Sequence, residues 1–308
     1  MDILDDILDT LNMKGVFYFR TDFSPPWAVS IPNLEQAARF HLVVQGILWV
    51  RFASGEMVQL GAGDLILIPH GASHIISCTP ETTAPDLETV LTTAGYKDDG
   101  VLIVGDGDKS ASTQLICGHF SFRKDADHPL LRALPDHLLI TTSVRAKNQW
   151  LDATLRLITQ CVFSESLGSA TTVMRLSEAV LIEILRAGVS TDARFGAIMK
   201  AFTDGQIGRA LLCMHQNPAT QWTVASLAAE VGMSRSRFSE RFSDLVGTSP
   251  MAYLSDWRLQ KALAMLDTSR SSVQQVSGEI GYQSPAAFTR AFSGKFGVSP
   301  SHYRKGLH

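Results

Sequence analysis

The sequence reads VGMSRSRFSERF at residues 231–242 and IGYQSPAAFTRAF at residues 280–292. Both stretches continue in the same way, as FSDLVGTSPMAY at 242–253 and FSGKFGVSPSHY at 292–303. In these tails the glycine, the Ser-Pro pair and the tyrosine recur at an offset of 50 residues, while the second copy has one extra residue in its earlier turn. The last third of the chain is therefore an internal repeat.

Each copy of the repeat predicts two helices joined by a tight turn. A short helix with an apolar face is expected at 224–231 and again at 273–280, and it ends at a glycine (Gly232 or Gly281) that suits left-handed backbone. In the following helix two phenylalanines four residues apart share one face, which is expected to pack against the first helix. The opposite face is small, polar or basic. This pattern is typical of a helix-turn-helix unit whose second helix enters the major groove of DNA.

The segment between the two copies predicts a rigid connection. Ser249 is suited to cap a helix and Pro250 to begin it, and the helix is expected to run to about Leu266. Its length of roughly 25 Å, at about 1.5 Å per residue, would hold two reading heads about one DNA turn apart, roughly 34 Å. An all-helical interaction module is the alternative, but the matched positions of the two copies favour DNA binding.

Charge is distributed unevenly along the chain. The net charge is −3, yet from residue 204 to the end 11 Lys and Arg stand against 7 Asp and Glu, with 16 against 23 elsewhere. A basic C-terminal part agrees with a nucleic-acid partner. We expect no membrane span, because no apolar run reaches about 18 residues. The absence of signal-peptide features and the scattered cysteines favour a cytoplasmic protein.

Residues 205–305 resemble the DNA-binding domain of the AraC/XylS family of regulators. The motifs that carry this resemblance are GYQS at 281–284, FTRAF at 288–292 and FGVSPSHYR at 296–304. The resemblance implies a set of DNA-contacting residues in the two recognition helices and the turns before them. They are Arg235, Ser236, Arg237, Ser239, Glu240, Gln283, Ser284, Ala286, Thr289 and Arg290.

The charged residues among these positions differ in what they are expected to do. Arg290 is the best candidate for a bidentate contact with guanine. Glu240 departs from the family pattern, which often has a basic residue there, and its carboxylate would either accept from cytosine N4 or weaken phosphate binding. Arg235 and Arg237 are expected at phosphates or bases, although Arg237 and Arg241 could equally be solvated surface charges.

The N-terminal part predicts a different fold. Between about residues 13 and 140, short apolar runs such as 47–52 and 65–68 alternate with Gly, Asp and Pro turns, which indicates a sandwich or barrel of short strands. The stretch GDLILIPHGASH at 63–74 resembles the second motif of cupin barrels, where a histidine points inward. The resemblance implies a cupin-type sensor domain in front of the DNA-binding domain.

Four residues of this barrel are candidates for binding an effector: His41, His74, Cys117 and His119. Three of them, His41, His74 and His119, are also the candidate metal ligands, with histidines that only hydrogen-bond inside the barrel as the alternative. Whether the protein uses a cofactor stays open. A thiol switch through Cys117 or Cys78 is a second functional hypothesis. A metal-dependent cupin enzyme is a third, disfavoured because the first cupin motif lacks its histidines and glutamate.

Apolar residues at helical spacing between about 148 and 189 predict two amphipathic helices, interpreted as a dimer interface. The expected fold is therefore multi-domain α+β: a cupin-like barrel at 1–145, a helical linker for dimerisation at 146–200 and a double helix-turn-helix domain at 201–308. The expected function is a transcription regulator and not an enzyme. Its expected partners are promoter DNA, a small-molecule effector, a second copy of the chain and, if it activates, RNA polymerase.

Overall fold

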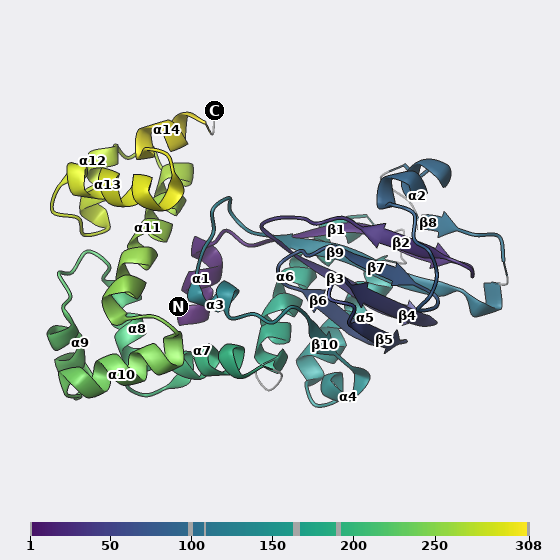
Figure 1. The fold of residues 1–308 in the computed structure, drawn as a ribbon, viewed down its shortest axis with the longest axis horizontal. Helices are drawn as coiled ribbons and strands as arrows, with labels where there is room; N and C mark the ends of the chain where they lie inside the picture. Colours follow the sequence, from purple (N-terminus) through teal and green to yellow (C-terminus); the bar gives the residue numbers. More distant parts are fainter. Residues whose placement is uncertain (1, 98–100, 108, 163–166, 189–191, 307–308) are drawn as a thin grey trace. The chain divides into compact units, whose positions relative to one another are not determined.

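The computed structural model describes the chain except residues 1, 98–100, 108, 163–166, 189–191 and 307–308 (Figure 1). The chain packs into two compact units. The barrel unit comprises residues 14–122 and 134–192, and the helix-turn-helix unit comprises residues 1–13, 123–133 and 193–308. Two segments distant in sequence from the repeat thus belong to its unit. The expected domain boundaries at 145 and 200 remain a prediction.

The barrel unit contains two sheets. One has the strand order β10-β6-β3-β9-β1-β8 and the other β2-β7-β4-β5; β1 and β8 pair in parallel, and the other strand pairs of the described residues are antiparallel. The strands are β1 (Lys14–Phe23), β2 (Ala28–Ile31), β3 (Ala37–Gln45), β4 (Ile47–Phe52), β5 (Met57–Gly61), β6 (Leu65–Ile68), β7 (His74–Ser77), β8 (Val101–Val104), β9 (Thr113–Ser121) and β10 (Leu138–Ile140).

The core of this unit lies between the sheets. Side chains of alternate strand positions, among them Leu48, Val50 and Ile66, are completely buried there. Burying such side chains is the main term that stabilises the fold. The strands expected at 47–52 and 65–68 are confirmed as β4 and β6.

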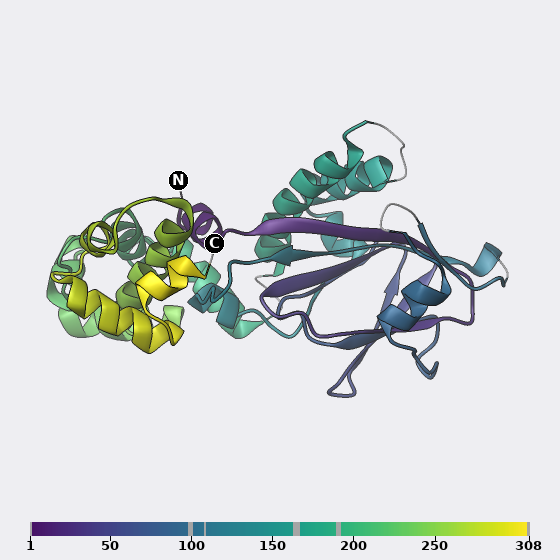
Figure 2. The ribbon, with the colours of Figure 1, turned by 90° about the horizontal axis from the view of Figure 1, so that it is seen from above.

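Helices cover the barrel unit at its sheet surface and ends. They are α2 (Leu87–Thr93), α4 (Thr142–Arg145), α5 (Gln149–Val162) and α6 (Ser169–Ala187), with a short 3-10 turn at Lys109–Ala111. Figure 2 shows α5 and α6 side by side along β1, and α6 approaches β1 so closely that a Cβ at Gly15 would lie 3.1 Å from the Met174 carbonyl oxygen. The two amphipathic helices expected between 148 and 189 are therefore confirmed.

Within its described residues, the helix-turn-helix unit contains helices and no strands. Its helices are α1 (Ile3–Thr10), α3 (Pro129–Arg132), α7 (Ala193–Thr203), α8 (Ile207–Gln216), α9 (Val224–Glu230), α10 (Arg235–Val246), α11 (Pro250–Thr268), α12 (Val273–Glu279), α13 (Pro285–Phe296) and α14 (Pro300–Lys305). None of the described helices of the chain is long and apolar enough to cross a membrane.

The repeat folds as its pattern predicts. Gly232 and Gly281 have φ of +66° and +88°, and each ends the turn after the first helix of its copy, α9 or α12. Ser249 caps α11, which begins at Pro250 and links the two copies. At Gly281 a Cβ would lie 2.7 Å from the Ala219 Cα, so this position requires glycine for space as well as for backbone geometry.

Candidate nucleic-acid interface and barrel cavity

The second helices of the two copies, α10 and α13, each separate a buried face from an exposed one. Phe238 and Phe242 of α10, and Phe288 and Phe292 of α13, are fully buried. Because residues three and four apart share a helix face, burying these rings turns the other face of each helix outward. The geometry is that of two recognition helices with their reading surfaces open to solvent.

The residues predicted to contact DNA lie on these outward surfaces. Eight are exposed and two are half-buried, and none is buried. The exposed residues are Arg235, Ser236, Arg237, Glu240, Gln283, Ser284, Ala286 and Arg290, and the half-buried ones are Ser239 and Thr289. The structure thus groups them by copy, five on each. Their contacts with DNA remain predictions.

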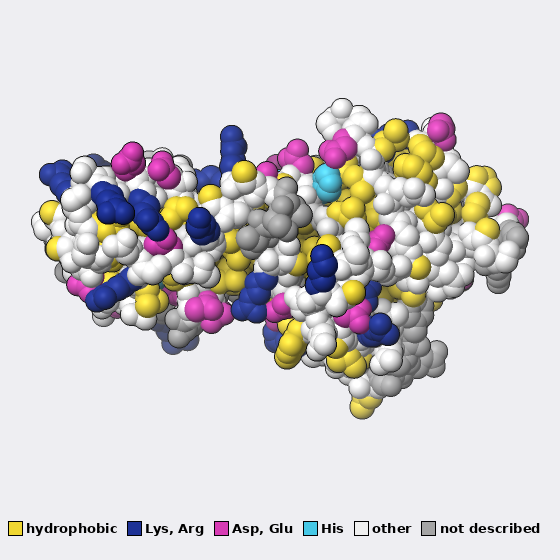
Figure 3. Space-filling view, turned by 90° about the horizontal axis from the view of Figure 1, so that it is seen from below, with side chains coloured by type: hydrophobic (Ala, Val, Ile, Leu, Met, Phe, Trp, Pro, Cys, Tyr) yellow, Lys and Arg dark blue, Asp and Glu magenta, His cyan; other side chains and the backbone are white. Residues whose placement is uncertain are grey.

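Two side chains near these surfaces have structural partners. Arg241 pairs with Asp204 at 2.5 Å, so this arginine holds α10 to the loop before α8. The Ser284 hydroxyl accepts a hydrogen bond from the Ala287 N–H and caps α13. On the face seen in Figure 3, Lys and Arg side chains are frequent over the helix-turn-helix unit, with acidic ones interspersed. Such a surface favours contacts between individual Lys or Arg side chains and DNA phosphates over a general electrostatic attraction to DNA.

The barrel unit holds a cavity of about 120 Å³ between its sheets. Its wall is mostly apolar, with Phe23, Val29 and Ile76 among the lining residues. Polar side chains line it from three neighbouring strands of one sheet, namely Thr21 of β1, Arg39 and His41 of β3 and Cys117 of β9. An apolar cavity with a few convergent polar groups is the usual form of a small-molecule site.

His41, His74 and Cys117 form one buried hydrogen-bonded chain. His74 Nδ1 donates to the Ala72 carbonyl at 2.8 Å, since a carbonyl can only accept. In a neutral His74, Nε2 then accepts from His41 Nε2–H at 2.9 Å, which leaves His41 Nδ1 to accept from the Cys117 thiol at 3.0 Å. In this arrangement both histidines and the thiol are hydrogen-bonded while all three stay neutral.

Burial explains why the two histidines and the thiol are neutral. Burial lowers the pKa of His41 far below its ordinary value, and lowers that of His74 to about 4, with the Arg39 charge adding to the effect. Burial also raises the pKa of the Cys117 thiol. A protonated, buried thiol is a poor target for oxidants, so the geometry does not support the hypothesis of a thiol switch at Cys117.

The remaining candidate residues, His119 and Cys78, lie outside the row of hydrogen bonds formed by His74, His41 and Cys117. His119 is two residues further along β9, opposite Arg39, and burial lowers its pKa to about 4. The Cys78 sulfur accepts from the Trp27 N–H at 3.3 Å. Within the described residues no group of three or more His, Cys, Asp or Glu gathers as a metal site. His74 and Cys117 bond opposite nitrogens of His41, so a single ion could not take all three as ligands.

A second buried network, in the helix-turn-helix unit, was not foreseen from the sequence. His215 of α8 donates from Nδ1 to Asp6 of α1 at 3.0 Å and accepts at Nε2 from the Tyr253 hydroxyl at 2.6 Å. The Tyr253 oxygen accepts from His128 Nε2–H at 3.0 Å, and Lys261 pairs with Asp6 at 2.5 Å. The partners are 38 to 255 residues apart in sequence, a separation that no local pattern signals.

Comparison with known proteins agrees with both units. The family described as Cupin matches residues 2–190, and the family described as Helix-turn-helix domain matches residues 227–306. The chain is 28% identical to the HTH-type transcriptional regulator AlkR of Acinetobacter baylyi, with 99% of each chain covered. It is 27% identical to the HTH-type transcriptional regulator MtrA of Neisseria gonorrhoeae, over 99% of this chain and 98% of the relative.

Among solved structures, the chain is similar to the DNA-binding domain of AdpA in complex with a target DNA. The identity is 34%, with 33% of this chain and 92% of that chain covered and a TM-score of 0.32. Two exposed recognition helices on a repeated scaffold, together with the full-length relatives AlkR and MtrA, define a DNA-binding transcription regulator. The chain belongs to the AraC/XylS family of transcriptional regulators, in the form that carries a cupin-type domain before the helix-turn-helix domain.

Proposed function

We propose that this regulator binds promoter DNA under the control of a small molecule that enters the barrel cavity. The observation that carries the proposal is the cavity itself, where an apolar wall surrounds Arg39, His41 and Cys117. This lining suits a compact, largely apolar molecule with one oxygen acceptor, because the Arg39 guanidinium carries five N–H donors, whereas the donors of His41 and Cys117 are used within their own hydrogen bonds. Since its relatives are named transcriptional regulators, we further infer that the chain is not an enzyme and acts in the cytoplasm.

The effector hypothesis is tested by thermal unfolding of the purified chain against a panel of small carboxylic acids, ketones and phenols. A true effector raises the melting temperature, because a ligand that binds only the folded state stabilises it. Leu87 is a half-buried residue of the cavity wall. Leu87→Trp should narrow the cavity and so abolish the rise in melting temperature. A compound that raises the melting temperature equally in this variant binds elsewhere, and if no compound acts on the wild type the hypothesis fails.

We propose that Arg290 reads a base pair of the operator. The Arg290 side chain is exposed in α13, on the side opposite the buried Phe288 and Phe292. Arg290→Ala should cost about 1–3 kcal/mol on the cognate site and relax discrimination at one base pair. The measurement is a binding titration on sites selected from random DNA, with Arg209→Ala, at an exposed ion pair of α8, as the control. An unchanged preference for cognate over scrambled DNA would remove this role.

We propose that two copies of the chain pair through α5. Trp150 and Leu157 are 71% and 48% exposed, and Ala153 lies exposed between them at helical spacing. Large apolar side chains in one exposed row commonly mark an interface. Light scattering should give about twice the chain mass of 33.6 kDa for the wild type and the single mass for Leu157→Glu. Gln59→Glu, an equal charge change on β5, should stay dimeric, and a monomeric wild type would refute the pairing.

We propose that the regulator activates transcription, in which case RNA polymerase is its partner. The proposal follows from the family resemblance of the repeat and is tested by transcription in vitro from a bound promoter. Increased transcript with the protein present supports activation, and decreased transcript shows repression instead.

A further inference from the structure

The segment Arg123–Ala133, here named the strap, is built into the helix-turn-helix unit although it follows the barrel strand β9. Its contacts run along α11, the helix that connects the two copies of the repeat. At one end, the Arg123 guanidinium forms an ion pair with Asp267 and donates to the Leu263 carbonyl. Midway along the strap, His128 donates to Tyr253 at 3.0 Å. The strap therefore spans α11 from Tyr253 to Asp267, about 20 Å at 1.5 Å per residue.

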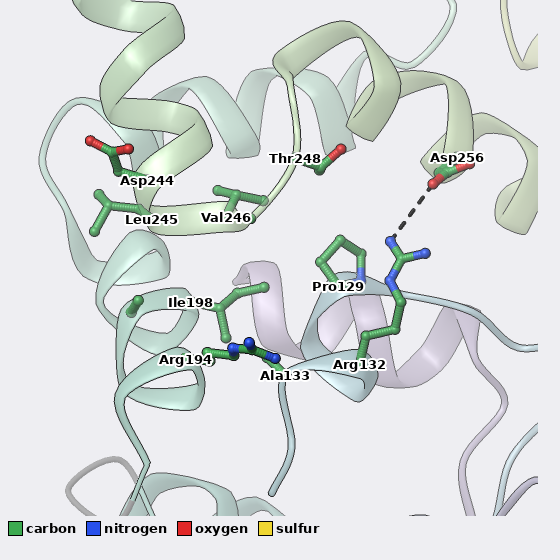
Figure 4. A pocket seen from close by; sticks show the side chains of 12 residues that line it. Pro129, Arg132, Ala133, Arg194, Ile198, Asp244, Leu245, Val246, Thr248 and Asp256 are labelled. Carbon is green, nitrogen blue, oxygen red and sulfur yellow. Dashed lines mark ion pairs between the residues drawn. The ribbon is translucent and has the colours of Figure 1, made fainter.

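Two more contacts join the strap to α11. The Gln260 side chain of α11, which is 1% exposed, donates to the Asp125 carbonyl at 3.2 Å. Figure 4 shows Arg132 reaching from the strap to Asp256 of α11. Arg123 and His128 are themselves 7% and 2% exposed. The buried contacts of Arg123, His128 and Gln260 specify one arrangement, because leaving either partner unpaired is costly, whereas the ion pair of Arg132 with Asp256 is partly exposed.

The strap also holds the second recognition helix. Lys295, near the end of α13, lies 2.9 Å from Asp127 of the strap and 2.7 Å from Asp256 of α11. This lysine is thus shared between the linker helix and the strap, and it fixes α13 against both. Toward the first copy the strap is separated from the end of α10 by an open cleft, lined by Pro129 on one side and Val246 on the other (Figure 4).

We propose that the strap is a positioning element for DNA binding, which fixes the second recognition helix on α11 and so sets the spacing of the two half-sites that the regulator accepts. A double reader tolerates only the spacing at which both helices meet their grooves. With the strap bound along its side and linked to α13, the helix α11 restricts that spacing more than it would without the strap. The strap residues need not touch DNA, so their removal should leave base preference within each half-site intact.

With the effector in the barrel cavity as proposed above, the chain connection would make the strap a route for its signal. Cys117 lines the barrel cavity on β9, and Arg123 begins the strap six residues later in the sequence. The neighbouring strand β1 is connected in a similar way, because it follows α1 in the chain. Asp6 of α1 belongs to the buried hydrogen-bonded network around Tyr253. β1 and β9 pair at Lys14 and Ser121. A change in these two strands would thus reach both segments that brace α11.

The test compares operators that differ only in half-site spacing. A consensus operator is selected from random DNA with the full-length chain, and versions with one base pair added to or removed from the spacer are made. The variant Asp127→Asn removes the carboxylate charge that pairs with Lys295. The double variant Arg123→Gln/Asp127→Asn also removes the ion pair of Arg123 with Asp267. Arg209→Gln, in an exposed ion pair of α8 away from the strap, is the matched control. Circular dichroism confirms that each variant is folded.

The expected result is that both strap variants lose at least tenfold of the wild-type preference for the consensus spacing, while base preferences within each half-site do not change. The control should keep the wild-type preference. If the double variant does not fold, the single variant Asp127→Asn, at a partly exposed side chain, decides alone. A spacing preference equal to the wild type, or an equal loss of affinity on all three operators, would overturn the proposal.

Discussion

Phe292→Ala should lower the free energy of unfolding of the helix-turn-helix unit by about 3–5 kcal/mol, the usual cost of emptying a buried phenylalanine site. Phe292 is completely buried and its ring lies 4.6 Å from Phe296, 5.6 Å from Phe288 and 5.9 Å from Tyr303 between ring centroids. Domains of this kind are stable by about 5–15 kcal/mol. The loss therefore removes between about one fifth and all of this stability, and DNA binding through the second copy should weaken.

The measurement is urea unfolding followed by circular dichroism, together with a DNA-binding titration. Phe242→Ala provides the matched change in the first copy, because Phe242 is equally buried against Phe238 and Tyr253. Gly294→Ala is the control within α13: space is open around it, and alanine in a helix interior should add about 0.5–1 kcal/mol. A loss below about 1 kcal/mol for Phe292→Ala would show that the second copy contributes little to the core.

The repeat was predictable because its signals are local. A glycine at positive φ, a serine cap and two phenylalanines four residues apart each act within one turn of helix, and the structure places all of them as the pattern predicts. The two copies reinforced each other, so that the linker helix between them could be predicted from Ser249 and Pro250 alone. The strands at 47–52 and 65–68 were predictable for the same reason, as short apolar runs between turns.

The composition of the helix-turn-helix unit was not predictable. The N-terminal helix is visible as an amphipathic stretch, but nothing local says that Asp6 pairs with Lys261, 255 residues away. The strap contains a short helix of only four residues, Pro129–Arg132, and its side chains gain their meaning only from α11 and α13. Periodicity reports the direction of a buried face but not the element that covers it, which is why these partners appear only in the folded chain.

The candidate effector site was partly predictable. The PHG turn and the cupin resemblance identified His74, and the structure brings His74 together with His41 and Cys117. The sequence could not show that His41 bonds the other two through opposite nitrogens, a geometry that argues against one shared metal ion. It also could not show that Arg39, 7% exposed, belongs to the same wall.

The buried histidine chain predicts that the barrel unit loses stability in mild acid. The pKa of His74 falls from 6.5 to about 4 on folding, mainly through burial, with the Ala72 hydrogen bond opposing the shift and Arg39 adding to it. A depressed folded pKa means that the unfolded chain binds the proton first, so stability is full above pH 6.5 and is lost as the pH falls toward 4. At about 1.4 kcal/mol per unit, His74 alone contributes a loss of about 3 kcal/mol.

Urea unfolding of the barrel unit at pH 7 and pH 4.5 measures this loss, and His74→Gln tests its origin. The variant removes the titrating group, so its stability should change by about 2–3 kcal/mol less than that of the wild type over the same interval. Ile76→Val in the cavity wall is the matched control, since it costs about 0.5–1.5 kcal/mol without a titrating group and should do so equally at both pH values. An acid loss as large in His74→Gln as in the wild type would place the proton uptake on another group and remove the neutral His74 from the account of the cavity.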